Sequence, residues 1–177
     1  MPRTANVITI HRRMYEVAPG RLYAGALPAS PDIDEIDEII KFPVKQWGVS
    51  RFINLMEPDE RDHAGKPFNS YEASAARFGA EMVRFPIRDM SIPTESLMKE
   101  ILNYIDQQIA LKKAVYVHCW GGFGRTGVVV GCWLKRHGES NPVAKIHQLR
   151  RNTINASQGS PQSSEQFEMI SRWRIGE

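Results

Sequence analysis

Residues 114–127 read AVYVHCWGGFGRTG, and this stretch decides the fold of the chain. The segment 114–118 is apolar up to its final histidine, which predicts a buried strand. A glycine-rich turn follows, and the three valines after Gly127 indicate an apolar helix. A strand, a glycine loop and a helix in this order present main-chain N–H groups at a helix N-terminus. The sequence therefore predicts a phosphate-binding loop between that strand and that helix.

Two side chains of this loop carry chemistry. Cys119 stands at the end of the strand, and Arg125 follows it after five intervening residues. If the loop closes into a cradle, the N–H dipoles and Arg125 stabilise the thiolate of Cys119, which is the nucleophilic form. The planar guanidinium can clamp two phosphoryl oxygens, and the hydroxyl of Thr126 can stabilise the sulfur as it leaves. The pattern therefore indicates nucleophilic catalysis on a phosphate monoester.

Strands and helices alternate along the rest of the chain. Apolar stretches between turn signals predict strands over 21–25, 51–55, 81–85 and 114–118. The first helix, which follows the first strand, is limited by Pro43 and Gly48. This alternation predicts an α/β domain with a central, mainly parallel sheet of about four to five strands flanked by helices. We interpret residues 1–20 as an irregular N-terminal arm and residues 21–177 as one domain.

Composition sets further limits. The chain has 177 residues and a formal net charge of +3, which suits an anionic substrate without arguing for nucleic acid. We interpret the basic run His147–Arg151 as a solvated helix face. The two cysteines, Cys119 and Cys132, do not form a disulfide framework, so we expect a reducing compartment, the cytoplasm. The pattern predicts neither a signal peptide nor a membrane-spanning helix.

The order His, Cys, five residues, Arg and Thr resembles the signature of the protein tyrosine phosphatase superfamily, and most of all its dual-specificity-like branch. The resemblance covers the chain from about residue 21 to residue 173. It implies a phosphocysteine intermediate on Cys119 and phosphate binding by Arg125, a mechanism that requires no cofactor. Because the four histidines other than His118 show no ligand spacing, we predict no metal. The loop that would hold the phosphate consists of Trp120, Gly121, Gly122, Phe123, Gly124 and Arg125.

The leaving oxygen needs a proton in such a reaction, and the best candidate for the acid is Asp89. It lies 30 residues before Cys119, in the loop 85–93 that two prolines frame. This loop resembles the movable acid loop of dual-specificity phosphatases and departs from the Trp-Pro-Asp version of the tyrosine-specific enzymes. The alternative acid is Asp106, which lies within a predicted amphipathic helix.

The second step needs a positioned water. The segment 162–167 resembles the Q-x-x-x-Q segment of tyrosine phosphatases, which implies that Gln162 positions this water, with Gln166 as second choice. His118 is interpreted as a structural residue that orients the loop and favours the thiolate. Cys132 is interpreted as a core residue rather than a redox partner.

The substrate class stays open between alternatives. We predict phosphotyrosine, phosphoserine or phosphothreonine in proteins, and the alternative is an inositol phosphate, a lipid or a nucleotide. Because the loop holds no lysine between Cys119 and Arg125, a highly phosphorylated inositol is disfavoured. Trp120 and Phe123 suit aromatic contacts with a substrate and simple packing equally well.

Other classes of protein also carry a cysteine or a glycine-rich loop after a strand. A sulfurtransferase would not need the arginine, the threonine or an upstream acid. A pseudophosphatase that only binds phosphoproteins is disfavoured by the intact cysteine, arginine and acid. The segment Gly122–Gly127 matches G-x-G-x-x-G, but no acidic residue lies about 20 positions further on, as a dinucleotide-binding fold requires.

Overall fold

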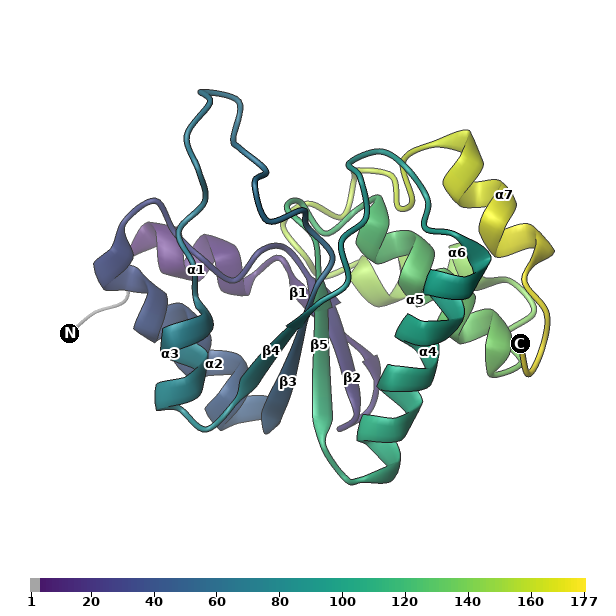
Figure 1. The fold of residues 1–177 in the computed structure, drawn as a ribbon, viewed down its shortest axis with the longest axis horizontal. Helices are drawn as coiled ribbons and strands as arrows, with labels where there is room; N and C mark the ends of the chain where they lie inside the picture. Colours follow the sequence, from purple (N-terminus) through teal and green to yellow (C-terminus); the bar gives the residue numbers. More distant parts are fainter. Residues whose placement is uncertain (1–3) are drawn as a thin grey trace.

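The computed structural model describes residues 4–177, in which a five-stranded sheet lies between two groups of helices (Figure 1). The strand order is β1-β2-β5-β3-β4. Only β1 runs antiparallel to its neighbour, and the other pairs are parallel. The predicted α/β fold with a mainly parallel sheet is therefore confirmed. The strands are β1 (Met14–Ala18), β2 (Leu22–Gly25), β3 (Val49–Asn54), β4 (Glu81–Arg84) and β5 (Ala114–His118).

The helices divide between the two faces of the sheet (Figure 1). One face carries α1 (Ala5–His11), α2 (Ile36–Trp47), with the short 3₁₀ turn η1 (Ile33–Glu35) before it, and α3 (Glu72–Arg77). The other face carries α4 (Glu95–Ala110), α5 (Arg125–Arg136), α6 (Pro142–Arg150) and α7 (Ser164–Arg172). No helix of residues 4–177 is both long enough and apolar enough to cross a membrane.

The expectation of an irregular N-terminal arm is wrong for residues 4–20. This segment forms α1 and β1, and Val7, Ile10 and Met14 are buried in the core. The strand β1 pairs with β2 and so covers that edge of the sheet. The backbone of β1 forms hydrogen bonds with a partner strand, and its apolar side chains are buried in the core. These interactions stabilise a segment that is too short to be recognised from the sequence alone. Residues 1–3 of the expected arm lie outside the described part of the chain.

The helix α2 runs through Pro43, although the sequence pattern predicted that Pro43 limits it. A proline has no N–H and leaves the carbonyl four residues earlier without its helical donor. Here the ring nitrogen Nε2 of His11 lies 3.0 Å from that carbonyl, on Ile39, and donates to it from α1. The helix then ends, as predicted, at Gly48, whose φ of 68° lies in the left-handed region.

The loops that follow β3, β4 and β5 gather at the carboxyl ends of these strands, at the top of Figure 1. They are residues 55–71, residues 85–94 and residues 119–124. These loops leave the carboxyl ends of parallel strands, where ligands bind in open α/β sheets. The fold thus brings the predicted nucleophile and the predicted acid to the same end of the sheet.

Candidate active site

The loop after β5 offers a row of main-chain N–H groups without acceptors. From Trp120 to Thr126, none of these groups donates to an acceptor among residues 4–177. The first backbone bond of the following helix is donated by Gly127 to the carbonyl of Phe123, at 3.2 Å. Cys119, at the start of the loop, is only 3% exposed. Because buried N–H groups nearly always have a partner, this loop is suited to an anionic ligand.

Gly122 allows the loop to turn back against β2. Its φ is 81°, in the left-handed region, and a Cβ there would lie 2.5 Å from the carbonyl carbon of Gly25. Gly25 has no room for a side chain either, because a Cβ would lie 2.7 Å from the hydroxyl of Tyr116. That hydroxyl donates to the carbonyl of Ala26 at 2.6 Å. The path of the loop therefore requires glycine on both sides of this contact.

Contacts from neighbouring segments hold the loop from outside. The N–H of Leu27 donates to the carbonyl of Trp120 at 2.9 Å, and the hydroxyl of Ser160 donates to the carbonyl of Phe123 at 2.7 Å. The guanidinium of Arg150 lies 5.0 Å from the centre of the Phe123 ring, within cation–π range. Phe123 thus packs against a buried cation, which is one of the two roles that the sequence left open for it.

Arg150 itself is 1% exposed, although it belongs to the run 147–151 that we interpreted as a solvated helix face. Its guanidinium donates to the carbonyls of Asn155 at 3.0 Å and of Gln158 at 2.8 Å. The interpretation is therefore wrong for this side chain. Carbonyl acceptors of the following loop, rather than water, satisfy the buried charge.

His118 anchors the start of the loop. Its Nδ1 lies 2.9 Å from the carbonyl of Cys119 and its Nε2 lies 2.6 Å from the hydroxyl of Tyr71. A carbonyl only accepts, so Nδ1 carries the proton and Nε2 accepts from the tyrosine. Burial lowers the pKa of His118 to about 3, with Arg84 and Arg125 adding to this effect against the opposing Cys119 carbonyl. The ring is therefore neutral and bonds to the loop backbone.

This arrangement predicts acid sensitivity of the fold. Because the pKa of His118 falls from 6.5 to about 3 on folding, the unfolded state binds the proton more tightly. The contribution of the neutral His118 to the free energy of unfolding is complete above about pH 6.5. It is lost as the pH falls toward 3. We expect this residue alone to lower the free energy of unfolding by about 2 kcal/mol between about pH 6.5 and pH 5.

Urea unfolding of the native chain and of His118→Asn at both pH values measures this effect. The variant removes the titrating ring, so its stability should depend less on pH than that of the native protein. An equal pH dependence in the two proteins would show that His118 is not buried as a neutral ring.

Arg125 opens α5 and is held by a carboxylate from another loop. Its Nη1 and Nη2 each donate to one oxygen of Glu60, both at 2.7 Å, and Nη1 also donates to the carbonyl of Ile87 at 3.0 Å. The side chains of Arg125 and Glu60 are only 1% and 11% exposed. Burial lowers the pKa of Arg125, but the hydrogen bonds to Glu60 and the negative charges of Cys119, Glu60 and Asp89 outweigh it and raise the pKa overall. A bidentate pair of this kind fixes the plane of the guanidinium.

Glu60 is the site residue that sequence reasoning missed. It belongs to the charged loop 57–66, which follows the predicted strand 51–55 and in which the sequence singles out no residue. The available signal was an acidic loop at the carboxyl end of β3, next to the strand that carries Cys119. That signal does not say which of the four acidic residues in the loop reaches the arginine.

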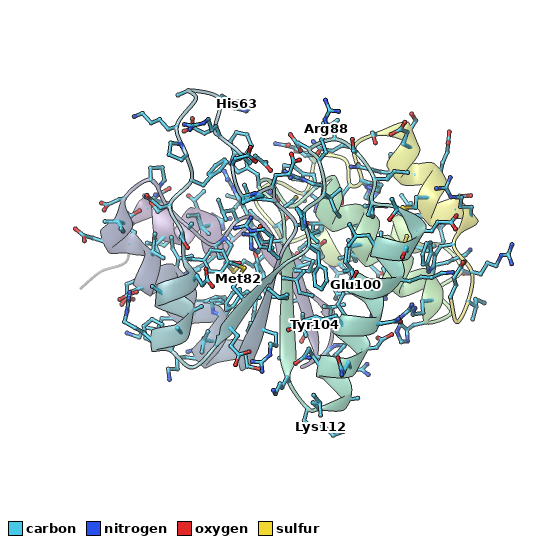
Figure 2. All side chains as sticks on the ribbon, in the orientation of Figure 1. His63, Met82, Arg88, Glu100, Tyr104 and Lys112 are labelled. Carbon is cyan, nitrogen blue, oxygen red and sulfur yellow. The ribbon has the colours of Figure 1, made fainter. Side chains whose placement is uncertain are left out.

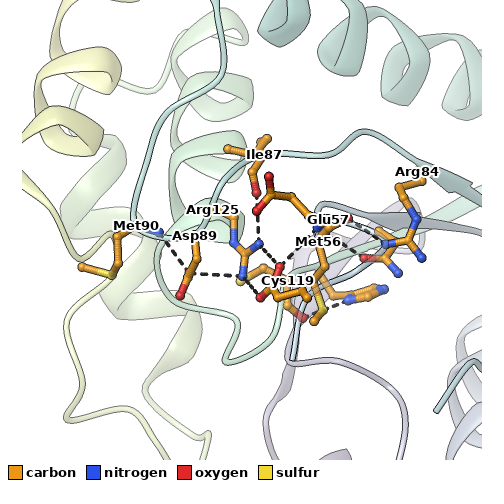
Figure 3. Close-up of polar contacts among 11 residues, drawn as sticks. Met56, Glu57, Arg84, Ile87, Asp89, Met90, Cys119 and Arg125 are labelled. Atoms are coloured by element: carbon orange, nitrogen blue, oxygen red, sulfur yellow. Dashed lines mark hydrogen bonds and ion pairs between the residues drawn. The ribbon is translucent and has the colours of Figure 1, made fainter. Parts of the chain in front are cut away.

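Asp89 lies beside the same guanidinium. Its Oδ1 is 3.1 Å from Nη2 of Arg125, and Figure 3 shows the two side chains pointing toward one another. Oδ1 also accepts the N–H of Met90, whose φ of 62° is unusual for a residue with a side chain. The side chain of Asp89 is 56% exposed, so it borders the loop from the solvent side. The neighbouring Arg88 points away from the site, at the top of Figure 2.

Asp106, the alternative acid, has a different role. Its carboxylate accepts hydrogen bonds from Trp133 at 2.9 Å and from Arg136 at 3.0 Å, and it pairs with His137 at 3.0 Å. All three partners lie in the last turn of α5 or directly after it, at the end opposite Arg125. Asp106 therefore ties α4 to α5.

Two buried polar atoms in the first turn of α5 have no partner among residues 4–177. They are Nε of Arg125 and Oγ1 of Thr126. A buried donor without an acceptor costs free energy, so such atoms in native structures call for an explanation. Both belong to the start of α5, and like the N–H groups of the preceding loop they are unpaired. The edge of the guanidinium that carries Nε is thus left for a ligand.

The two predicted glutamines lie beside the loop in different environments. Gln162 is exposed, and its Oε1 lies 2.7 Å from the position that a Cβ on Gly124 would take. Gln166 is fully buried, accepts the N–H groups of Gln162 and Ser163, and donates to the carbonyl of Ser91 at 3.1 Å. Gln166 therefore joins α7 to the acid loop, and the amides of both glutamines lie beside Gly124, with only that of Gln162 exposed.

Cys132 lies in the middle of α5 and is fully buried. Burial raises the pKa of its thiol to about 12. It is therefore a neutral thiol at physiological pH, and both cysteines are free. This environment agrees with the interpretation of Cys132 as a core residue.

Comparison with known proteins identifies the family. The model of a family described as "Polymorphic toxin system, DSP-PTPase phosphatase" matches residues 31–139, which include β3, β4, β5, the acid loop and the cysteine loop. The chain belongs to this family. The resemblance to dual-specificity-like phosphatases that the sequence suggested is thereby confirmed.

Two of the curated relatives of this DSP-PTPase domain are named as phosphatases of different substrates. The chain is 29% identical over 130 residues to the phosphatidylglycerophosphate phosphatase PTPMT2 of Arabidopsis thaliana, covering 73% of this chain and 50% of that protein. It is 39% identical over 62 residues to the mouse dual specificity protein phosphatase CDC14B, covering 35% of this chain and 12% of that protein. The chain thus spans half the length, or less, of these curated relatives.

Solved structures support the fold. The crystal structure of PTPMT1 in complex with PI(5)P superposes with a TM-score of 0.69 at 19% sequence identity, covering 91% of this chain and 94% of that one. At this identity the likeness concerns the arrangement of the sheet and helices. It agrees with the cysteine-phosphatase fold that the sequence predicted.

Proposed function

We propose that this DSP-PTPase domain hydrolyses phosphate monoesters through a phosphocysteine intermediate on Cys119. The observation that carries the proposal is the set of unpaired donors directly after this cysteine. It comprises the N–H groups from Trp120 to Thr126 and Nε of Arg125. Donors held in place before the substrate arrives stabilise the charge of a phosphoryl group in the transition state.

In the first step the sulfur of Cys119 attacks the phosphorus, an S–P bond forms and the P–O bond to the leaving group breaks. Asp89 gives its proton to the departing oxygen, for which its position beside Arg125 is suitable. Arg125 and the loop amides bind the phosphoryl oxygens. Glu60 keeps the guanidinium in the required plane throughout.

In the second step water attacks the phosphorus and the S–P bond breaks. Asp89 takes the proton of this water, which returns the carboxyl to its starting state. Gln162 positions the water from the side of Gly124. The hydroxyl of Thr126, buried and unpaired, stabilises the sulfur as it leaves. Splitting the reaction in two lowers the barrier of each step.

The role of Asp89 predicts a dependence on the leaving group. In Asp89→Ala, kcat/KM for an alkyl phosphate should fall by about 10²- to 10⁴-fold, because an alkoxide leaves poorly without a proton. For p-nitrophenyl phosphate the fall should be much smaller, because nitrophenolate leaves without help. Steady-state kinetics with both substrates, in the presence of a chelator, measures the difference.

The matched control is Asp59→Ala, which removes an exposed carboxylate from the neighbouring loop. It should leave both values unchanged. Equal losses with the two substrates in Asp89→Ala would move the acid role to another residue. Thiocyanate formation from thiosulfate and cyanide by the native chain would favour a sulfurtransferase instead.

The substrate class stays a prediction. The names of the relatives include a protein phosphatase and a phosphatase of phosphatidylglycerophosphate. A panel of phosphopeptides, phospholipids, inositol phosphates and nucleotides, compared by kcat/KM, decides between the phosphoprotein substrate predicted from the sequence and its non-protein alternative.

A further inference from the structure

A cavity of about 460 Å³ lies next to the catalytic loop. It shares Trp120 with that loop, and Trp120 directly follows Cys119 in the chain. Its other walls come from α1 and the turn after it, from residues 26–31 and from residues 62–69. Cavities of about 300–1,000 Å³ are typical of small-molecule sites.

Aromatic and aliphatic side chains form one part of this wall. The ring centre of Trp120 lies 4.5 Å from that of His63 and 5.1 Å from that of Phe68. His63 lies at the tip of the loop 55–71, at the top of Figure 2. Phe68 and Leu27 line the cavity together with Trp120. Trp120 therefore belongs both to the catalytic loop and to the aromatic part of the cavity wall.

Two cations form the other part. Arg13 and Lys66 line the cavity, and neither pairs with a carboxylate among residues 4–177. The acidic residue of the lining, Asp62, accepts the N–H groups of Ala64 and Lys66 within its own loop. The cavity therefore offers two positive charges without ion-pair partners and one negative charge beside an apolar wall.

We propose that this cavity binds the non-reacting part of the substrate, and that this part carries a second anionic group held by Arg13 and Lys66. The proposal rests on the proposed phosphatase function and names the class of substrate. It is a small phosphate monoester with a second phosphate or carboxylate, such as a bisphosphorylated lipid headgroup or a soluble bisphosphate. A cavity walled by four segments suits such a molecule better than it suits a peptide.

Matched aryl phosphates test the second anion directly. The probes are 4-methylphenyl phosphate and 4-(phosphonomethyl)phenyl phosphate, which differ in one phosphonate that the enzyme does not hydrolyse. In the native chain the phosphonate should lower KM and leave kcat nearly unchanged. In Arg13→Ala/Lys66→Ala, kcat/KM for the phosphonate probe should fall by about tenfold to a hundredfold, because charge-assisted contacts are lost.

The control variant Arg12→Ala/Lys45→Ala removes two exposed cations outside the cavity lining. It should behave as the native protein, and both double variants should hydrolyse 4-methylphenyl phosphate at the native rate. If the native chain hydrolyses neither probe, the proposed function itself fails. If it hydrolyses both equally well, or if both double variants lose the preference, only the second-anion proposal fails.

Two further arms separate the sources of the second anion. A short-chain bisphosphorylated lipid below its critical micelle concentration and a soluble sugar bisphosphate are compared with their monophosphates. Preference for either bisphosphate, lost in Arg13→Ala/Lys66→Ala, supports the proposal and tells a lipid headgroup from a free metabolite. A higher kcat/KM for an acidic phosphopeptide than for both bisphosphates would overturn it.

Discussion

Replacement of Cys119 by serine is expected to abolish the hydrolysis of every phosphate monoester, with a loss of about 10⁵-fold or more. The serine hydroxyl has nearly the same shape, but it stays protonated at neutral pH and is a much weaker nucleophile than a thiolate. His118 is neutral, but its ring is not available as a base for the serine. Its Nε2 accepts from Tyr71, and its Nδ1 donates to the backbone carbonyl of Cys119. Release of inorganic phosphate from an aryl phosphate measures the loss.

Binding should survive this substitution, because the unpaired N–H groups and Arg125 do not depend on the sulfur. Calorimetry with inorganic phosphate should therefore show binding to Cys119→Ser. The matched control is Cys132→Ala, which removes the other cysteine and should keep most of the activity. Turnover that persists in Cys119→Ser would end the assignment of the nucleophile.

Replacement of Arg125 by lysine should lower kcat/KM by about 10³-fold or more, although the positive charge is kept. Lysine has no Nε–H edge, and its single ammonium group would be drawn to the carboxylate of Glu60, which now receives two guanidinium donors. The phosphoryl oxygens would then lose the donor that the buried Nε provides. Steady-state kinetics with p-nitrophenyl phosphate measures the effect.

Arg136→Lys is the matched control, because Arg136 lies in the same helix and also donates to a carboxylate. It should change kcat/KM little. A loss of similar size in both variants would indicate a general effect on α5. An active Arg125→Lys would show that a simple positive charge is enough at this position.

The strand, loop and helix around Cys119 could be predicted because their signals are local. The apolar run, the glycines and the spacing of cysteine and arginine all lie within one stretch of the sequence. Asp89 could be proposed because its loop, which two prolines frame, resembles the acid loop of dual-specificity phosphatases. The position of Gln162 near Gly124 also agrees with a sequence motif.

The partners that hold these residues could not be predicted, because they come from distant segments. Glu60 reaches Arg125 across 65 positions, and Tyr71 reaches His118 across 47. Which acidic side chain of an irregular loop points inward depends on how that loop packs. The buried environment of Arg150 depends in the same way on carbonyls of the loop that follows it.

The structure of the N-terminal segment could not be predicted for a related reason. The strand β1 has five residues, with Glu16 exposed in its middle, which is a weak pattern in isolation. It is stabilised by its pairing with β2 and by the core that both strands share. Strands at a sheet edge often depend on such pairing, which a single sequence does not reveal.

Everything in the proposed mechanism requires a phosphoryl group to pass through the sulfur of Cys119. Asp89→Ala mixed with p-nitrophenyl phosphate should form this intermediate readily and hydrolyse it slowly, because the second step lacks its base. Rapid acid quenching followed by peptide mass spectrometry should find the added phosphoryl group on the peptide that contains Cys119. Release of nitrophenol without any phosphorylated peptide, or with the phosphoryl group on another residue, would contradict the account.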